Sequence, residues 1–219
     1  GKSLPEATLM FAKFSPDASR VAYVSRNNIY VESLVDGKIN QLTQDGNNEI
    51  VNGTFDWVYE EEFAFNRALE FSPDSKMLAF IRFDEREVPS YTFPVFAGEV
   101  PHIAPYEKYP GEYTYKYPKT GEKNSKVSVH TFDIKSKVNL PLEEGGYIPR
   151  IRFTQDPNKL AIMTLNRHQN RFDLYFADPR STVCKLAVRD ESDTYIRENV
   201  FDNIIFYPET FSFVSERNG

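Results

Sequence analysis

The chain has 219 residues, of which 40% are hydrophobic and 15% aromatic, and this composition excludes an intrinsically disordered protein. Lysine and arginine total 26 against 32 aspartate and glutamate, and no basic segment offsets the net charge of −6, so a nucleic-acid-binding protein is not expected. No apolar run approaches the ~18 residues of a membrane span, and residues 1–30 lack the pattern of a signal peptide.

Short β-branched and aromatic segments separated by polar turns predict strands along most of the chain. In chain order, these segments are residues 20–25, 28–31, 38–43, 77–83, 127–132, 160–165, 172–176, 183–188 and 211–215. A phenylalanine followed by a turn with proline and an acidic residue recurs at Phe14, Phe71 and Phe153, and a truncated copy begins at Phe206. Proline presets a turn and aspartate bonds back to its backbone, so these motifs predict turns without chemistry.

This recurrence, approximate and interrupted, also predicts the architecture. A unit of about four strands every 40 to 50 residues is typical of a β-propeller blade. The sequence therefore predicts an all-β fold made of propeller blades, about four of them in this chain. We expect the aromatic side chains to fill the space between neighbouring blades.

Residues 84–126 interrupt this recurrence of strands and are predicted to form a long insertion or arm. The segment holds six prolines and eight aromatic residues. Loops of this length in a compact domain are usually functional. We therefore expect the segment to wrap an edge of the domain or to reach a partner.

Motifs of common catalytic sites are not found in the sequence: it has no Gly-x-Ser-x-Gly, no phosphate-binding glycine loop and no His-Glu-x-x-His. Among the three histidines, His102 is expected in the long loop, His130 in a strand and His168 in a polar turn. The single cysteine, Cys184, excludes an internal disulfide and a cysteine-based zinc site. We expect no metal or cofactor and assign no catalytic residue within the chain.

Residues 56–63 differ from the rest of the chain, since they contain its only tryptophan. They also contain three consecutive glutamates, Glu60, Glu61 and Glu62. Asp56 can cap a short helix with these glutamates in or near its first turn, where the helix dipole favours negative charge. A solvated, capped helix without function is therefore one interpretation.

The apolar residues around the three glutamates favour a second interpretation. Tyr59 and Phe63 flank the cluster, so we expect it to be partly buried, where adjacent carboxylates repel one another and suit a bound cation. An ammonium group has three donors, which two carboxylates can satisfy with charge-assisted hydrogen bonds. A metal fits less well, because no histidine or further carboxylate stands at ligand spacing.

The same residues 56–63 resemble the signature of the dipeptidyl peptidase IV family of serine exopeptidases. Other segments resemble this family's N-terminal domain in the expected order, namely residues 27–31, 83–85, 88–89, 117–121 and 165–170. The resemblance covers nearly the whole chain. It implies a propeller of about eight blades, of which this chain supplies about half, and a short helix that reaches from the propeller into the catalytic cavity.

The resemblance also implies roles for individual residues. Glu61 and Glu62 correspond to the pair that binds the free N-terminal ammonium of a peptide, and Glu60 corresponds to a supporting residue. Binding the N-terminus at a fixed distance from the nucleophile implies release of dipeptides, Xaa-Pro or Xaa-Ala. The family places an arginine from a later blade near the substrate carbonyl, and Arg197 stands at about this position; a surface arginine is the alternative.

The family's catalytic serine, aspartate and histidine belong to an α/β-hydrolase domain that follows the propeller, and this chain contains no such domain. We therefore expect the chain to be part of a longer serine dipeptidyl peptidase and to be inactive alone. The alternatives are a non-catalytic propeller that binds peptides or protein partners and, with less support, a carbohydrate-active propeller. The resemblance further implies a periplasmic, secreted or cell-surface location and a homodimer formed partly through an arm, for which residues 84–126 are our candidate.

Overall fold

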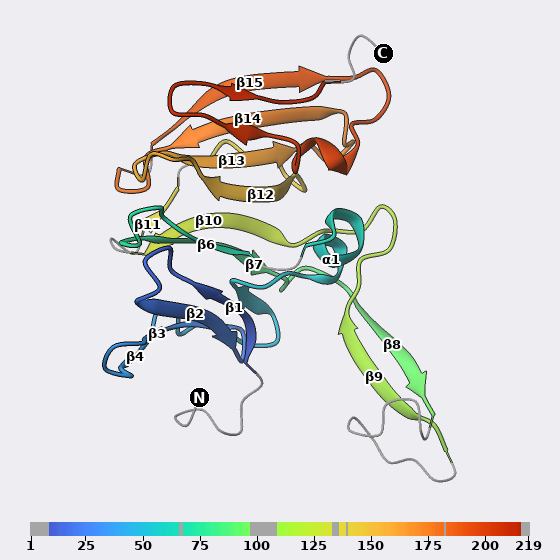
Figure 1. Ribbon diagram of the computed structural model, residues 1–219. Helices are drawn as coiled ribbons and strands as arrows, with labels where there is room; N and C mark the ends of the chain where they lie inside the picture. The colour runs from blue at the N-terminus through green and yellow to red at the C-terminus, as the bar shows by residue number, and fades with distance from the viewer. Residues whose placement is uncertain are drawn as a thin grey trace.

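Three antiparallel sheets follow one another along the chain and lie as successive layers (Figure 1). The computed structural model describes residues 9–65, 68–96, 109–132, 136–138, 140–181 and 183–215. Within these residues it contains one α-helix, α1 (Trp57–Phe63), and one short 3-10 helix, η1 (Glu198–Val200). None of the helices in the described residues is long and apolar enough to cross a membrane. The all-β prediction is confirmed, and the number of blades in a whole propeller stays a prediction.

The first and third sheets are regular four-stranded meanders in which each strand pairs with the next one along the chain. The first sheet consists of β1 (Met10–Phe14), β2 (Arg20–Ser25), β3 (Asn28–Ser33) and β4 (Ile39–Gln41). The third consists of β12 (Tyr147–Phe153), β13 (Leu160–Leu165), β14 (Arg171–Ala177) and β15 (Cys184–Glu191). A two-stranded hairpin follows at the truncated repeat, β16 (Ile205–Phe206) and β17 (Phe211–Ser212).

The second sheet differs because its first strand is split. Its strands are β5 (Ile50–Asn52), β6 (Leu69–Phe71), β7 (Leu78–Asp84), β10 (Lys126–Phe132) and β11 (Ser136–Lys137). Both β5 and β6 pair with β7, along the edge opposite β10. Ile81 joins the two halves, since its carbonyl accepts from the Gly53 N–H at 3.0 Å and its N–H donates to the Ala68 carbonyl at 2.8 Å. The segment between the halves contains α1.

The recurring phenylalanine motifs are turns between the first and second strands of each sheet, as predicted. The Ser15 hydroxyl donates to the Asp17 carboxylate at 2.7 Å, and Ser72 donates to Asp74 in the same way at 2.6 Å. The sequence does not predict the strand before each turn, β1, β6 or β12. These strands are short or mix exposed and charged residues with apolar ones, so their pattern does not stand out.

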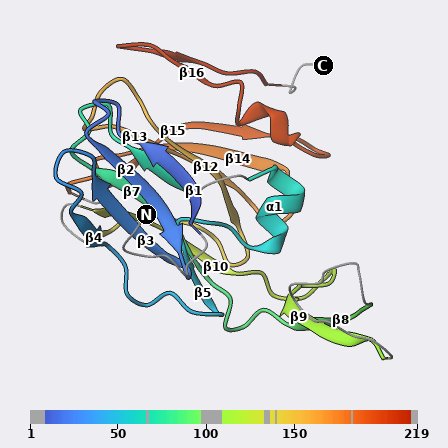
Figure 2. The same ribbon diagram turned by 60° about the horizontal axis from the view of Figure 1, so that its bottom comes forward.

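Residues 84–126 contain a β-hairpin of β8 (Ser90–Val95) and β9 (Gly111–Lys116), which pair with each other and project away from the three sheets (Figures 1 and 2). The sequence predicts no strand in this segment, and β8 and β9 show that this prediction is wrong. Pro94 fits within β8 because a two-stranded hairpin has free edges where no N–H is needed. The rings of Phe93 and Tyr115 stack across the hairpin, with centroids 5.3 Å apart.

The core lies between neighbouring sheets. A large cluster joins the second and third sheets and includes the fully buried side chains of Phe83, Ile162 and Phe172. A smaller cluster joins the first and second sheets around Ile29 and Leu78. Each such side chain contributes roughly 1.5–3 kcal/mol by leaving water. The prediction that aromatic side chains fill the space between neighbouring sheets is confirmed for the large cluster.

Candidate functional site

Helix α1 begins at the residue that the sequence indicates as its cap. The Asp56 carboxylate accepts a hydrogen bond from the Tyr59 N–H at 2.9 Å, and Ala64 closes the other end in the left-handed region at φ +48°. Seven residues are too few for a stable isolated helix. The position of α1 therefore depends on its contacts with the sheets.

Two aromatic side chains attach α1 to separate parts of the molecule. The Trp57 ring lies 4.2 Å, between centroids, from the ring of Tyr117, which follows β9 at the base of the hairpin. The buried Tyr59 hydroxyl accepts a hydrogen bond from the N–H of Ile148 in β12 at 2.8 Å. The helix thus bridges the second and third sheets on the side where the hairpin leaves (Figure 2).

The three glutamates of α1 are all exposed, so the expected partial burial of this cluster is wrong. Tyr59 and Phe63 are four residues apart and share the buried face of the helix. Each residue turns the helix by about 100°, so the three positions between them face away from the core. The carboxylates of Glu60, Glu61 and Glu62 therefore cover the solvent-facing arc of α1, where a ligand can reach them.

Each glutamate has different neighbours. Glu60 lines a cavity of about 510 Å³ between α1 and the hairpin. Burial is the main cause that raises the pKa of Tyr115 in β9, and the Glu61 carboxylate adds to it. Burial likewise raises the pKa of Tyr195 after β15, and the Glu62 carboxylate contributes there. Glu61 is therefore near enough to the hairpin, and Glu62 to the segment before η1, for their charges to act there.

Arg197 is exposed and stands directly before η1. Its segment is attached to the third sheet, because the N–H of Ile196 donates to the Gln169 carbonyl at 2.9 Å. Phe201 then packs against Phe63 of α1, with ring centroids 6.2 Å apart. The structure therefore brings the segment of Arg197 beside the C-terminal part of the helix, although 136 positions separate Arg197 from Glu61 in the sequence.

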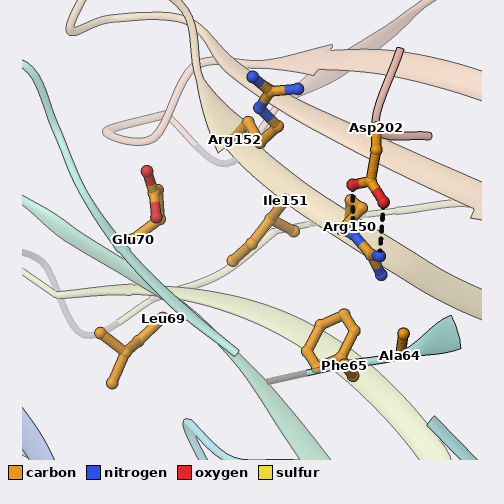
Figure 3. Close-up of a pocket in the computed structure, with 8 residues that line it drawn as sticks. All are labelled: Ala64, Phe65, Leu69, Glu70, Arg150, Ile151, Arg152 and Asp202. Atoms are coloured by element: carbon orange, nitrogen blue, oxygen red, sulfur yellow. Dashed lines mark hydrogen bonds and ion pairs between the residues drawn. The ribbon is translucent and has the colours of Figure 1, made fainter. Parts of the chain in front are cut away.

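A second cavity, of about 500 Å³, lies beyond the C-terminal end of α1 (Figure 3). It is lined by Ala64, Phe65, Leu69, Glu70, Arg150, Ile151, Arg152 and Asp202. Arg150 donates to both carboxylate oxygens of Asp202, at 2.9 and 3.0 Å, and its guanidinium lies 5.4 Å from the Phe65 ring centroid. Glu70 pairs with Lys13. The acidic groups of this cavity already have cationic partners, so the carboxylates suited to an ammonium are those of α1.

The arginines of this second cavity do not stand out in the amino-acid sequence. Arg150 and Arg152 occupy ordinary polar positions of a strand. They line a cavity only because β12 lies against β6 in the folded chain. Arg152 donates to the Ile204 carbonyl at 3.1 Å, which attaches the segment after η1 to the same strand.

The histidines and the cysteine lie in different places. His130 is in β10, where its ring stacks on Phe80 with centroids 5.3 Å apart, and His168 lies in the turn after β13, so both predictions are confirmed. Cys184 begins β15 and is half-buried. His102 lies outside the described residues.

Relatives in the sequence comparisons are dipeptidyl peptidases. A family model described as the dipeptidyl peptidase IV (DPP IV) N-terminal region matches residues 2–219. Dipeptidyl peptidase 4 of Arthroderma otae is 39% identical over 226 residues, which cover 96% of this chain and 27% of the relative. Dipeptidyl peptidase 4 of Trichophyton rubrum is 33% identical over 220 residues, again 96% of this chain and 27% of the relative.

Solved structures show the same relationship. The crystal structure of Porphyromonas gingivalis dipeptidyl peptidase 4 matches with a TM-score of 0.88 and 41% identity, over 96% of this chain and 30% of that one. A putative dipeptidyl aminopeptidase IV from Bacteroides ovatus shares the fold at a TM-score of 0.75 and 22% identity. The chain spans less than a third of the length of these relatives. It belongs to the family of dipeptidyl peptidase IV N-terminal regions.

Proposed function

We propose that this chain supplies the substrate-gating, N-terminus-binding part of a serine dipeptidyl peptidase. Glu61 and Glu62 bind the free ammonium group of a peptide, and Glu60 supports them. The observation on which the proposal rests is that α1 is fixed to two sheets through its buried face while its three glutamates stay exposed. A fixed ammonium site sets the register of the peptide and therefore the bond that is cut.

The geometry of α1 suits an ammonium ligand. Adjacent residues of a helix project about 100° apart, so the two carboxylates approach the ligand from different directions. An ammonium group offers three donors and no acceptor, and each hydrogen bond to a charged group contributes about 1.5–3 kcal/mol. Arg197, whose segment packs beside α1, is the candidate for contact with the substrate carbonyl.

The groups that break the peptide bond come, in this proposal, from an α/β-hydrolase domain of the same polypeptide outside this chain. That domain supplies the serine, aspartate and histidine, and the products are dipeptides with proline or alanine in the second position. No cofactor takes part. Family membership supports this assignment, and it also supports a periplasmic, secreted or cell-surface location, which fractionation of the source cells would test.

Steady-state kinetics of the full-length protein with a glycyl-prolyl chromogenic substrate test the ammonium site. Glu62→Gln keeps the shape of the side chain but removes its charge, so we expect kcat/KM to fall by about 10- to 100-fold, mostly through KM. Glu112→Gln in the hairpin is the matched control and should leave both constants unchanged. Equal kinetics of the Glu62 variant and the wild type would remove the assignment.

Binding of peptides separates the enzyme from the alternative, a non-catalytic propeller. Both require a free N-terminus, so acetylated peptides should not bind in calorimetry in either case. Only the enzyme releases dipeptides, and only its gene continues into a Gly-x-Ser-x-Gly motif followed by aspartate and histidine. Binding without turnover would support the alternative.

We also propose that residues 84–126 form an arm that contributes to a homodimer. The hairpin exposes the aromatic side chains of Tyr91, Phe93 and Tyr113 outside the core. Burying such a surface in a partner is favourable. Sedimentation of the full-length protein should show a dimer that Phe93→Asp weakens, and an unchanged dimer would exclude this role for Phe93.

A further inference from the structure

The cavity between α1 and the hairpin contains acidic groups that the ammonium site does not use. Its lining includes Asp56, Glu60, Glu85, Tyr115 and Lys116. Asp56 and Glu85 are each only 7% exposed. Two buried carboxyl groups therefore lie beside the start of the helix that presents Glu61 and Glu62.

Asp56 is bound on both carboxylate oxygens. One oxygen accepts from the Tyr59 N–H at 2.9 Å, and the other accepts from the hydroxyl of Ser125, which stands just before β10. Burial raises the pKa of Asp56, and the hydrogen bonds from Ser125 and the backbone oppose that shift. The donors on both carboxylate oxygens favour the ionised form of Asp56.

Glu85 is in the opposite situation, because its carboxyl makes no hydrogen bond with another described residue. The nearby ammonium of Lys116 donates instead to Glu49 at 3.2 Å and to the Val88 carbonyl at 3.1 Å. Burial, followed by the charge of Asp56, raises the pKa of Glu85 to about 8; Lys116 opposes this shift and Glu49 adds to it. At neutral pH, Glu85 therefore retains its proton.

We propose that Glu85 is a positioning residue for α1, whose protonated carboxyl adds no second charge beside Asp56 and so allows Asp56 to hold the helix in its ammonium-binding position. This inference rests on the proposed function of Glu61 and Glu62. When Glu85 ionises, two negative charges meet in a buried site, where repulsion is poorly screened. The cap weakens, α1 shifts, and the affinity for the substrate ammonium falls while the bond-breaking step is unaffected.

The pH dependence of KM in the full-length protein tests this role. Between pH 6.5 and 9.5 we expect the wild-type KM for a glycyl-prolyl substrate to rise about threefold to tenfold more than that of Glu85→Gln, with similar kcat in both. Glutamine reproduces the neutral carboxyl, so the variant should behave normally at pH 6.5. A rise common to both proteins reports the substrate amine, which loses its own charge near pH 8.

Glu87→Gln is the matched control, because Glu87 lies two residues further on, is exposed and pairs with Lys123 at 2.6 Å. Its KM profile should follow that of the wild type. If the Glu85→Gln profile also superimposes on the wild-type profile, the positioning role is wrong.

Hydrogen exchange gives a readout that does not depend on catalysis. At pH 9, the amides of residues 60–63 should exchange about threefold faster or more in the wild type than in Glu85→Gln, and at pH 6.5 the two proteins should agree. Equal exchange at pH 9 would overturn the positioning role even if the ammonium site is correct. Faster exchange in the wild type would support it even if Glu62→Gln shows no kinetic effect.

Discussion

The second and third sheets build the same four-strand pattern in different ways. The third runs through β12, β13, β14 and β15 without interruption, and all six residues of β13 are buried. The second is interrupted twice, by α1 between β5 and β6 and by the hairpin between β7 and β10. The regular third sheet serves as framework, whereas an interruption of the second sheet, α1, carries all three glutamates of the proposed ammonium site.

The two interruptions leave the sheet close together. The segment of α1 starts and ends beside Ile81, and the hairpin leaves at Asp84 and returns at Lys126, which is paired with Asp84. The two exit points, Ile81 and Asp84, are three positions apart in β7, about 10 Å along a strand. This closeness explains why Trp57 of α1 meets Tyr117 at the base of the hairpin.

If the third sheet is the framework, a cavity within it should have the largest effect on stability. Phe172 in β14 is fully buried and lies 5.7 Å, between ring centroids, from Phe201. We expect Phe172→Ala to lower the free energy of unfolding by about 3–5 kcal/mol, measured by urea denaturation. A loss below about 1 kcal/mol would mean that this sheet does not control global stability.

The second sheet should make stability depend on pH through Glu85. Its pKa of about 8 in the fold lies above the ordinary value of 4.5, so the unfolded chain releases this proton at lower pH. The Glu85 contribution to stability therefore falls by about 1.4 kcal/mol per pH unit as pH rises from about 4.5 to about 8, and then levels off. Urea midpoints should show that Glu85→Gln loses this slope, and parallel slopes would contradict the burial of a neutral Glu85.

Loss of the hydrogen bond that attaches α1 to the third sheet should lower the free energy of unfolding by a smaller amount. Tyr59→Phe removes the acceptor for the Ile148 N–H and leaves that group buried and unpaired, at a cost of about 1–3 kcal/mol. The amides of residues 60–63 should exchange faster in this variant, by a factor at least as large as the loss of global stability predicts. Tyr113→Phe is the control, because Tyr113 is 43% exposed and should show no change.

The hairpin should matter least to the stability of the sheets. Phe93→Ala removes the stack on Tyr115, yet the hairpin lies outside both core clusters, so we expect a change within about 0.5 kcal/mol. Urea denaturation of this variant and of Phe172→Ala in parallel compares the two regions directly. A large loss for Phe93→Ala would show that the hairpin belongs to the framework.

Much of the fold follows from local residue patterns. The strand at 160–165 and the turn at Ser15 and Asp17 are predicted correctly because a run of apolar and β-branched residues, like turn chemistry, acts over a few residues. The hairpin in residues 84–126 is missed because its prolines and polar residues hide two strands. The strand β6 is missed because three residues are too few for a pattern.

Neighbours within about four residues are enough to define the turns, most strands, the Asp56 cap and the glutamate motif, so these features can be predicted from the sequence. Tertiary contacts are needed to show that the three glutamates are exposed, that the segment of Arg197 lies beside α1, and that Glu85 is buried next to Asp56. Exposure and proton affinity depend on groups that folding brings together from distant positions. No local pattern contains that information, because the same residues in another fold would have different neighbours and a different charge.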